Sequence, residues 1–226
     1  LDSPPYYSAD SAAQSNLQAT AEPPAHREPK NTHEKSPAER IYNEEEQDLL
    51  LEAQRLLQLG IIEAEQAFND RAERCFTEAL EIYRSLCNLI GQSKALSCLG
   101  DLQEKKGNSS QSLDLRLRAL ELSRQSGNRL EVAECLTSIA GTHLLMSNLQ
   151  EALDHSEMAK EIHGEMGNRF GMKACLITMG GVYTIQSEHS MALQSYRSAL
   201  EITRELGAKS SEASLLESIG WIHHHV

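Results

Sequence analysis

The chain has 226 residues, of which 40% are hydrophobic, 24% charged and 4% aromatic. Its 33 acidic residues outnumber its 21 lysines and arginines, and the net charge at pH 7 is −12. Nucleic acids and anionic membranes attract clustered basic residues, so this balance argues against a nucleic-acid partner. No apolar run approaches the ~18–20 residues of a membrane helix, and we expect no membrane insertion.

Residues 1–42 differ in composition from the rest of the chain. All six prolines lie there, among Ser, Ala, Glu and Asn residues. So few apolar side chains cannot offset the entropy of ordering, and we predict a disordered tail. Tyr6 and Tyr7 could form a docking or phosphorylation site, although an ordinary disordered tail also explains them. The chain starts at Leu1 and not at a methionine, which favours a fragment or a processed form.

From residue 43 onward the sequence repeats itself every forty residues. The period is carried by a column of small residues: Gly60, Gly100, Ala140, Gly180 and Gly220. A leucine stands four positions before each of them, and small residues recur twelve and nineteen positions after most of them. Small residues are needed where helices pack closely, so the period predicts stacked helix pairs. The array spans 43–226, with repeats at about 50–89, 90–129, 130–169 and 170–209 and a truncated fifth at 210–226.

Helical spacing of apolar residues and turn residues predict the helix bounds. First helices are expected near 44–65, 91–106, 129–146, 169–186 and 209–225. Second helices are expected near 69–86, 109–126, 149–166 and 189–206. Gly127, Gly167 and Gly207 are expected to end second helices in the left-handed conformation. Asn108 and Asn148 are expected to supply turn and cap chemistry. No segment alternates with period two, so no strand is predicted and the fold class is all-α.

Two stretches carry a family resemblance. One reads Leu96-x-x-Leu99-Gly100, followed by Ser112 and by Ala119-Leu120-Glu121-Leu122; the other reads Leu176-x-x-Met179-Gly180-x-x-Tyr183, followed by Ala192, Tyr196 and Ala199. This spacing resembles the tetratricopeptide repeat, which implies a superhelical solenoid of antiparallel helix pairs. The usual unit of that family is ~34 residues. The forty-residue unit here resembles the longer repeats of Pins-type spindle-orientation adaptors and of rapsyn.

The resemblance implies that first helices line a concave groove for a partner. The candidate groove residues are Asp101, Glu134, Thr137, Ser138, Gly141, Leu144, Ile177, Thr178, Gly181, Thr184 and Trp221. The middle of this set is small and apolar, and its two glycines would let a ligand approach the backbone. We expect an extended or helical peptide with apolar anchors. The alternative interpretation is that these residues pack against adjacent repeats.

No catalytic or cofactor site is expected. The sequence shows no Ser/His/Asp set, no paired catalytic carboxylates and no phosphate loop, so an enzyme is not predicted. Three adjacent histidines at 223–225 point about 100° apart on a helix and cannot share a metal ion. His143 and His223 share a column with Tyr183 and are expected to be packing residues. Five cysteines without a C-x-x-C pair favour a reducing compartment, and hence the cytoplasm.

The preferred function is therefore a protein-interaction adaptor or scaffold whose partner the sequence does not identify. A second hypothesis is self-association through the fifth repeat, since no second helix would cover Leu216, Ile219, Trp221 and Ile222. A third is a regulatory segment of a larger multidomain protein.

Overall fold

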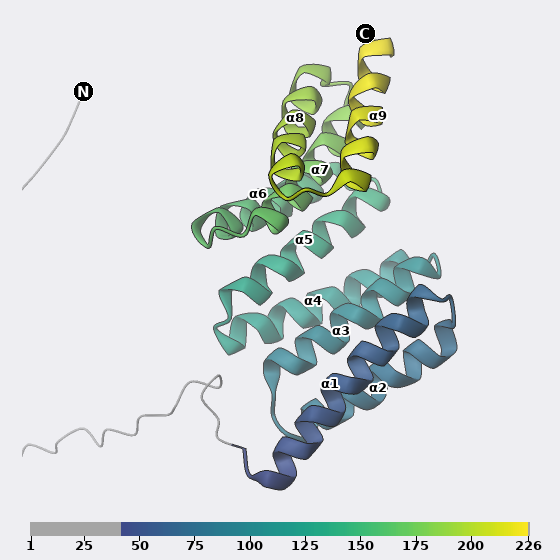
Figure 1. Ribbon diagram of the computed structural model, residues 1–226, viewed down its shortest axis with the longest axis vertical. Coiled ribbons are helices and arrows are strands. Elements are labelled where there is room, and N and C mark those ends of the chain that lie inside the picture. Colours follow the sequence, from purple (N-terminus) through teal and green to yellow (C-terminus); the bar gives the residue numbers. More distant parts are fainter. Residues whose placement is uncertain (1–41, 226) are drawn as a thin grey trace, which may run out of the picture. The chain divides into compact units, whose positions relative to one another are not determined.

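The computed structural model describes residues 42–225, except for the side chain of His225. The predicted tail therefore lies outside the described residues, apart from Tyr42. The described part holds nine α-helices and no strand: α1 (Glu44–Glu65), α2 (Asn69–Ser85), α3 (Leu89–Lys105), α4 (Ser109–Ser126), α5 (Arg129–Leu145), α6 (Leu149–Glu165), α7 (Arg169–Ile185), α8 (His189–Glu205) and α9 (Lys209–His225). Figure 1 follows them in chain order, from α1 in blue to α9 in yellow. The all-α prediction is confirmed, and every helix end except one lies within a residue of its expected place.

The exception is α3, which begins two residues earlier than predicted because an asparagine caps it. Asn88, Asn128 and Asn168 precede α3, α5 and α7. The side chain of each accepts a hydrogen bond from the backbone N–H three residues on, at 2.8, 3.1 and 3.0 Å. Such a bond satisfies an N–H that has no partner within the helix. Ala208 holds the same place before α9 and has no side-chain oxygen to offer.

The asparagines before α4 and α6 behave differently. Asn108 and Asn148 occupy the N-cap positions, as expected, but their side chains make no cap hydrogen bond. The Asn108 amide donates instead to Gln103 Oε1 at 2.9 Å, and the Asn148 amide lies 3.3 Å from His143 Nδ1. The predicted cap chemistry is therefore wrong at these two turns, where the amide joins the preceding helix to the turn.

Each connection between the described helices contains one residue with a left-handed backbone, and these residues recur every twenty positions. Gly127, Gly167 and Gly207 end second helices at φ +71°, +67° and +70°, as predicted. Gly107 serves the α3–α4 turn in the same way. Four turns use a residue with a Cβ, for which this conformation is strained: Ala67, Cys87, Ser147 and Ser187.

The forty-residue column is the place where each first helix packs against its own second helix. A large side chain sixteen positions later covers each buried glycine of the column: Phe76 over Gly60, Arg116 over Gly100 and Tyr196 over Gly180. Ala140 is the one column residue with a methyl group, and the small Ser156 stands at the equivalent position of its second helix. A large residue of the second helix therefore packs over each buried glycine, and a small residue packs over the alanine. This keeps the two helices of each pair closely packed.

Polar residues enter the core at the α5–α6 pair. One apolar cluster runs from α1 to α7, and a second joins α7, α8 and α9. His143 is buried, as predicted, and its ring stacks on that of His155 with centroids 5.3 Å apart. The same expectation fails for His223, which is exposed because no described helix follows α9 to cover it.

Candidate partner-binding surface

The first helices of neighbouring pairs pack against each other. Beyond successive helices, the closest packing in the described array joins α1 with α3, α3 with α5, and α5 with α7, whereas no such packing joins the second helices. The array is therefore most crowded on the side of the first helices, as expected for the inner side of a solenoid. We call this side, with the eleven candidate groove residues, the first-helix surface.

None of the eleven candidate residues is fully buried. Asp101, Glu134 and Trp221 are exposed, and the other eight are half-buried. The structure brings some of them together in pairs: Leu144 meets Gly181, and Thr184 and Trp221 line one pocket. Half-buried residues pack on a neighbouring repeat and still reach the surface, so both interpretations from the sequence stay open.

The buried side chain of Arg116 contacts residues of α3 and α5 that lie at this surface. It belongs to α4 and is almost fully buried, and its Nη2 lies 2.5 Å from Asp101 Oδ1. Its Nη1 lies 2.6 Å from Glu104 Oε2, donates to the Ser138 carbonyl at 3.0 Å, and also contacts Thr142 Oγ1. A buried charge requires such compensation. The Asp101 carboxylate is consequently held by the protein itself.

Sequence reasoning missed Arg116 because arginine is usually a surface residue. The signal was nevertheless present in the repeat. Arg116 stands in the column of Phe76, Ser156 and Tyr196, whose members all pack against a first helix. Register within the array was thus a better guide to its burial than its residue type.

The two glycines of the predicted groove differ in their surroundings. A Cβ added at Gly141 would meet no atom within 4 Å, so the backbone there is open. A Cβ added at Gly181 would lie 3.0 Å from Cδ2 of Leu144. The expectation that both glycines admit a ligand to the backbone is therefore wrong for Gly181, where Leu144 already occupies the space.

The half-buried hydroxyl of Thr137 makes its contacts within the protein. It donates to the Ala133 carbonyl at 2.8 Å, lies 3.1 Å from His163 Nε2 and 3.5 Å from Cys175 Sγ. Burial raises the pKa of the Cys175 thiol and lowers the pKa of His163. Both side chains therefore favour their neutral forms, which suits packing and not nucleophilic chemistry.

A similar polar cluster lies one repeat earlier. Ser93, Ser123 and Cys135 meet there, with Ser93 Oγ 2.7 Å from Ser123 Oγ and Ser123 Oγ 3.4 Å from Cys135 Sγ. Ser93 Oγ also lies 3.2 Å from Glu131 Oε1. Burial raises the pKa of the Cys135 thiol and of the Glu131 carboxyl. The cluster joins α3, α4 and α5 through hydrogen bonds across the repeat boundary.

Two pockets open on the first-helix surface. One, of about 420 Å³, lies between α7, α8 and α9 and is lined by Thr184, Tyr196, Ser214, Glu217, Ser218 and Trp221. The other, of about 280 Å³, lies between α1 and α3 and includes Gln54 and Lys94. The first pocket contains two of the eleven candidate residues, Thr184 and Trp221.

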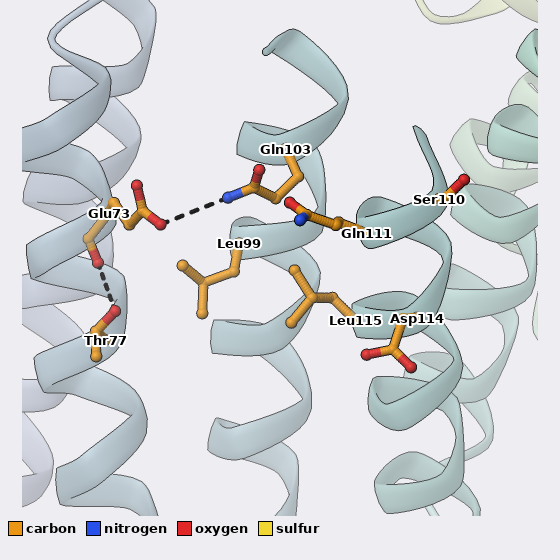
Figure 2. A pocket seen from close by; sticks show the side chains of 8 residues that line it. All are labelled: Glu73, Thr77, Leu99, Gln103, Ser110, Gln111, Asp114 and Leu115. Carbon is orange, nitrogen blue, oxygen red and sulfur yellow. Dashed lines mark hydrogen bonds between the residues drawn. The ribbon is translucent and has the colours of Figure 1, made fainter. Parts of the chain in front are cut away.

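A further pocket, of about 490 Å³, lies away from the candidate residues, between α2, α3 and α4. Figure 2 shows Leu99 and Leu115 pointing toward its centre, with Gln103 donating to Glu73 Oε1 at 3.5 Å beside them. It lies between the second helices α2 and α4. Sequence reasoning about a groove on the first helices gave no indication of it.

Helices α3 to α6 contain the stretch that matches a known family model. Residues 91–164 match the Tetratricopeptide repeat family model. They make up about a third of the chain, and the tetratricopeptide resemblance is confirmed for that stretch. The Pins-type or rapsyn-like subgroup stays a prediction, since the matching model is that of the general repeat. No curated protein matches the chain by sequence.

Solved structures with the same tetratricopeptide-like arrangement extend the likeness over most of the array. BtubC (BKLC) from P. vanneervenii aligns with a TM-score of 0.67 and 16% identity, over 80% of this chain and 81% of that one. Aspartyl phosphate phosphatase F from Bacillus subtilis aligns with a TM-score of 0.68 and 17% identity, over 80% and 48%. A Rap protein complexed with Competence and Sporulation Factor aligns with 0.67 and 18%, over 77% and 49%. The chain thus spans about half the length of the last two, and identities this low show the fold alone.

No helix within residues 42–225 combines the length and the apolar composition needed to cross a bilayer. Among the same residues, no three His, Cys, Asp or Glu side chains lie close enough together to hold a metal ion.

Proposed function

We propose that the chain is a non-enzymatic adaptor that binds a protein partner along the first-helix surface. The observation that carries this proposal is the contrast between two neighbouring columns. The forty-residue column of small residues, which we call the framework column, is nearly constant. Its members Gly60, Gly100 and Gly180 are buried. The next column varies widely in size and charge and is never buried: Ile61, Asp101, Gly141, Gly181 and Trp221. Divergence confined to an accessible surface is typical of a binding face on a repeat scaffold.

The partner we propose is a segment with apolar anchor residues. Leu145 and Ile185 are exposed large hydrophobic residues on α5 and α7. The equivalent residues of the first two repeats are Glu65 and Lys105, so this column is apolar only in the third and fourth repeats. An extended or helical peptide with apolar side chains would suit this half. The Rap protein complexed with Competence and Sporulation Factor supports the idea that this fold binds other molecules.

The test compares two glycine-to-arginine substitutions in the full chain. A side chain at Gly141 or at Gly164 would meet no atom within 4 Å at its Cβ, so both substitutions are compatible with the fold. Gly141 lies on the first-helix surface, and Gly164 lies on the second helix α6. Affinity capture from extracts of cells that express the protein should lose partners with Gly141→Arg and retain them with Gly164→Arg. Full retention by a folded Gly141→Arg variant contradicts the proposal.

A second candidate function, self-association, is favoured by the exposure of α9. Leu216 is 45% exposed, whereas Leu136, at the equivalent position of α5, is 1% exposed. Gly220 of the framework column is exposed as well. Sedimentation across concentrations distinguishes the two functions, since self-association would depend on concentration and would be abolished by Leu216→Glu. A chain that stays monomeric at all concentrations contradicts it.

We also propose that the protein works in a reducing compartment such as the cytoplasm. All five cysteines are free thiols in the structure. Burial raises the pKa of Cys98 to about 12, which keeps that thiol protonated and unreactive.

A further inference from the structure

The pocket between α7, α8 and α9 owes its space to a change in the repeat. One repeat earlier, Leu144 of α5 fills the space over Gly181 of α7, and α5 and α7 pack closely. The equivalent residues here are Thr184 and Trp221, and α7 and α9 are not among the closely packed pairs. The smaller threonine and the wider separation leave a recess of about 420 Å³. That volume suits a single large side chain of a partner.

The serine and threonine hydroxyls that line this pocket donate to backbone carbonyls of their own helices. Thr184 Oγ1 donates to the Gly180 carbonyl at 2.8 Å, and Ser218 Oγ donates to the Ser214 carbonyl at 3.0 Å. Ser214 Oγ donates to the Ser210 carbonyl at 3.4 Å. A hydroxyl has one proton and two lone pairs. While these bonds are kept, each of the three hydroxyls presents its lone pairs to a ligand as an acceptor.

The remaining wall of the pocket adds a negative charge and two aromatic rings. Glu217 on α9 contributes a carboxylate, which only accepts when ionised. Tyr196 forms the α8 side, and Trp221 is 50% exposed on α9. Aromatic faces attract cations, and the attraction increases where water is partly excluded. Acceptors, a carboxylate and aromatic rings together favour a cationic group with many N–H donors.

We propose that this pocket binds the guanidinium of an arginine side chain in the partner segment. The inference rests on the proposed function, since the arginine would belong to the segment that lies along the first-helix surface. Guanidinium has five donors and no acceptor, and its plane stacks on aromatic rings, whereas an ammonium is a strongly hydrated point charge. The net charge of −12 also favours approach of a basic segment.

The experiment uses the full chain and the fluorescence of Trp221, which is its single tryptophan. Nα-acetyl-arginine amide is titrated into the protein, and Nα-acetyl-citrulline amide serves as the neutral ligand of nearly equal shape. We expect a saturable change in the Trp221 emission with the arginine compound at millimolar concentration and none with citrulline. Equal responses to the two compounds, or no saturable response to arginine, overturn the proposal.

Two variants localise the response to the pocket. Glu217→Gln should weaken arginine binding roughly fivefold by removing the charge-assisted hydrogen bonds. Glu201→Gln removes one charge from an exposed position of α8 that does not line the pocket, and it should bind as the native chain does. Thr184→Leu, which reproduces Leu144, should fill the recess and abolish the response. Unchanged binding by folded Glu217→Gln or Thr184→Leu also overturns the proposal.

The outcome can be separated from that of the adaptor proposal. An arginine response in a chain whose partners are all unaffected by Gly141→Arg would support the pocket and contradict the first-helix surface as the partner site. Loss of partners with Gly141→Arg but no arginine response would contradict the pocket alone.

Discussion

The ring of Tyr196 lies over Gly180, and a Cβ added to that glycine would come within 2.7 Å of Tyr196 Cε1. We expect Gly180→Ala to reduce the free energy of unfolding by roughly 1–3 kcal/mol through overpacking. The Tyr196→Ser variant with Gly180→Ala reproduces the native Ala140–Ser156 combination. In the Tyr196→Ser background, Gly180→Ala should therefore change the free energy of unfolding little. Chemical denaturation of the four chains gives the coupling free energy, expected to be at least ~1 kcal/mol. Additive effects would show that the ring does not decide which residue the column accepts.

Arg116 holds the corresponding place over Gly100 with a charged side chain. Arg116→Ala should cost roughly 3 kcal/mol, because it removes packing and leaves Asp101 and Glu104 without their cation. Arg116→Phe reproduces Phe76 and should cost less than about 1 kcal/mol, since apolar groups of similar volume often replace buried charges without loss. Urea denaturation measures both variants. If the phenylalanine variant is as unstable as the alanine variant, the charge and not the packing is the essential contribution.

Ser147 and Ser187 hold left-handed backbone at φ +60°, where a Cβ is strained. Replacing either with glycine should raise the free energy of unfolding by about 0.5–1 kcal/mol. Gly167→Ala, at φ +67° with no atom near its Cβ, is the matched reverse change and should lower it by a similar amount. Thermal melts of the three variants check the sign. A destabilising Ser→Gly change would mean that flexibility of the unfolded chain outweighs the relieved strain.

Helix α9 lacks the asparagine cap that α3, α5 and α7 share. Ala208→Asn should stabilise α9 by about 1 kcal/mol, because its side chain could accept from the N–H three residues on. Hydrogen exchange at the amides of α9 should slow about fivefold, while exchange at α3 stays unchanged. Equal exchange in the two chains would show that α9 does not begin with the geometry of the other first helices.

Buried histidines predict a stability that depends on pH. Burial lowers the pKa of His143 and of His163 from the ordinary 6.5, with His155 adding to the effect on His143. As pH falls through 6.5 the unfolded chain binds protons that the folded chain resists, so the free energy of unfolding decreases. The decrease continues down to the folded pKa values. His143→Tyr, which reproduces Tyr183, should reduce the loss between about pH 7.5 and 5.5, as measured by denaturation at each pH. An unchanged loss would assign the dependence to other groups.

The helices could be predicted because the information that defines them is local and repeated. The forty-residue period places the helices, and the glycines at 127, 167 and 207 mark the ends of three of them, whereas the cap at Asn88 was missed and α3 was expected two residues late. The turns at Ser147 and Ser187 were placed correctly, but their left-handed conformation was not predicted, because neither residue is a glycine.

The surface could be predicted less well, because the direction of a side chain depends on its neighbours in space. Thr137 and Gly181 occupy the expected positions, yet one bonds to His163 and the other lies under Leu144. Asp101 faces the surface as expected, but its cation comes from Arg116, fifteen residues later and on another helix. Which contacts form across a repeat boundary depends on the residues of both repeats, and no single column contains that information.

The one small residue over the framework column, Ser156, among the large Phe76, Arg116 and Tyr196, also bears on how the chain avoids folding incorrectly. In a chain of similar units, a second helix could in principle dock on the first helix of a neighbouring unit, shifted by a whole repeat. Tyr196 or Phe76 could not seat over Ala140, whose methyl group would meet the ring, and Ser156 over Gly180 would leave a void. Exchanges that involve the α5–α6 pair are therefore mismatched, and α4, α6 and α8 each fit their own first helix better than they would fit across that pair. Such mismatches disfavour misassembled arrays while the chain is still collapsing, and so protect the order of the units.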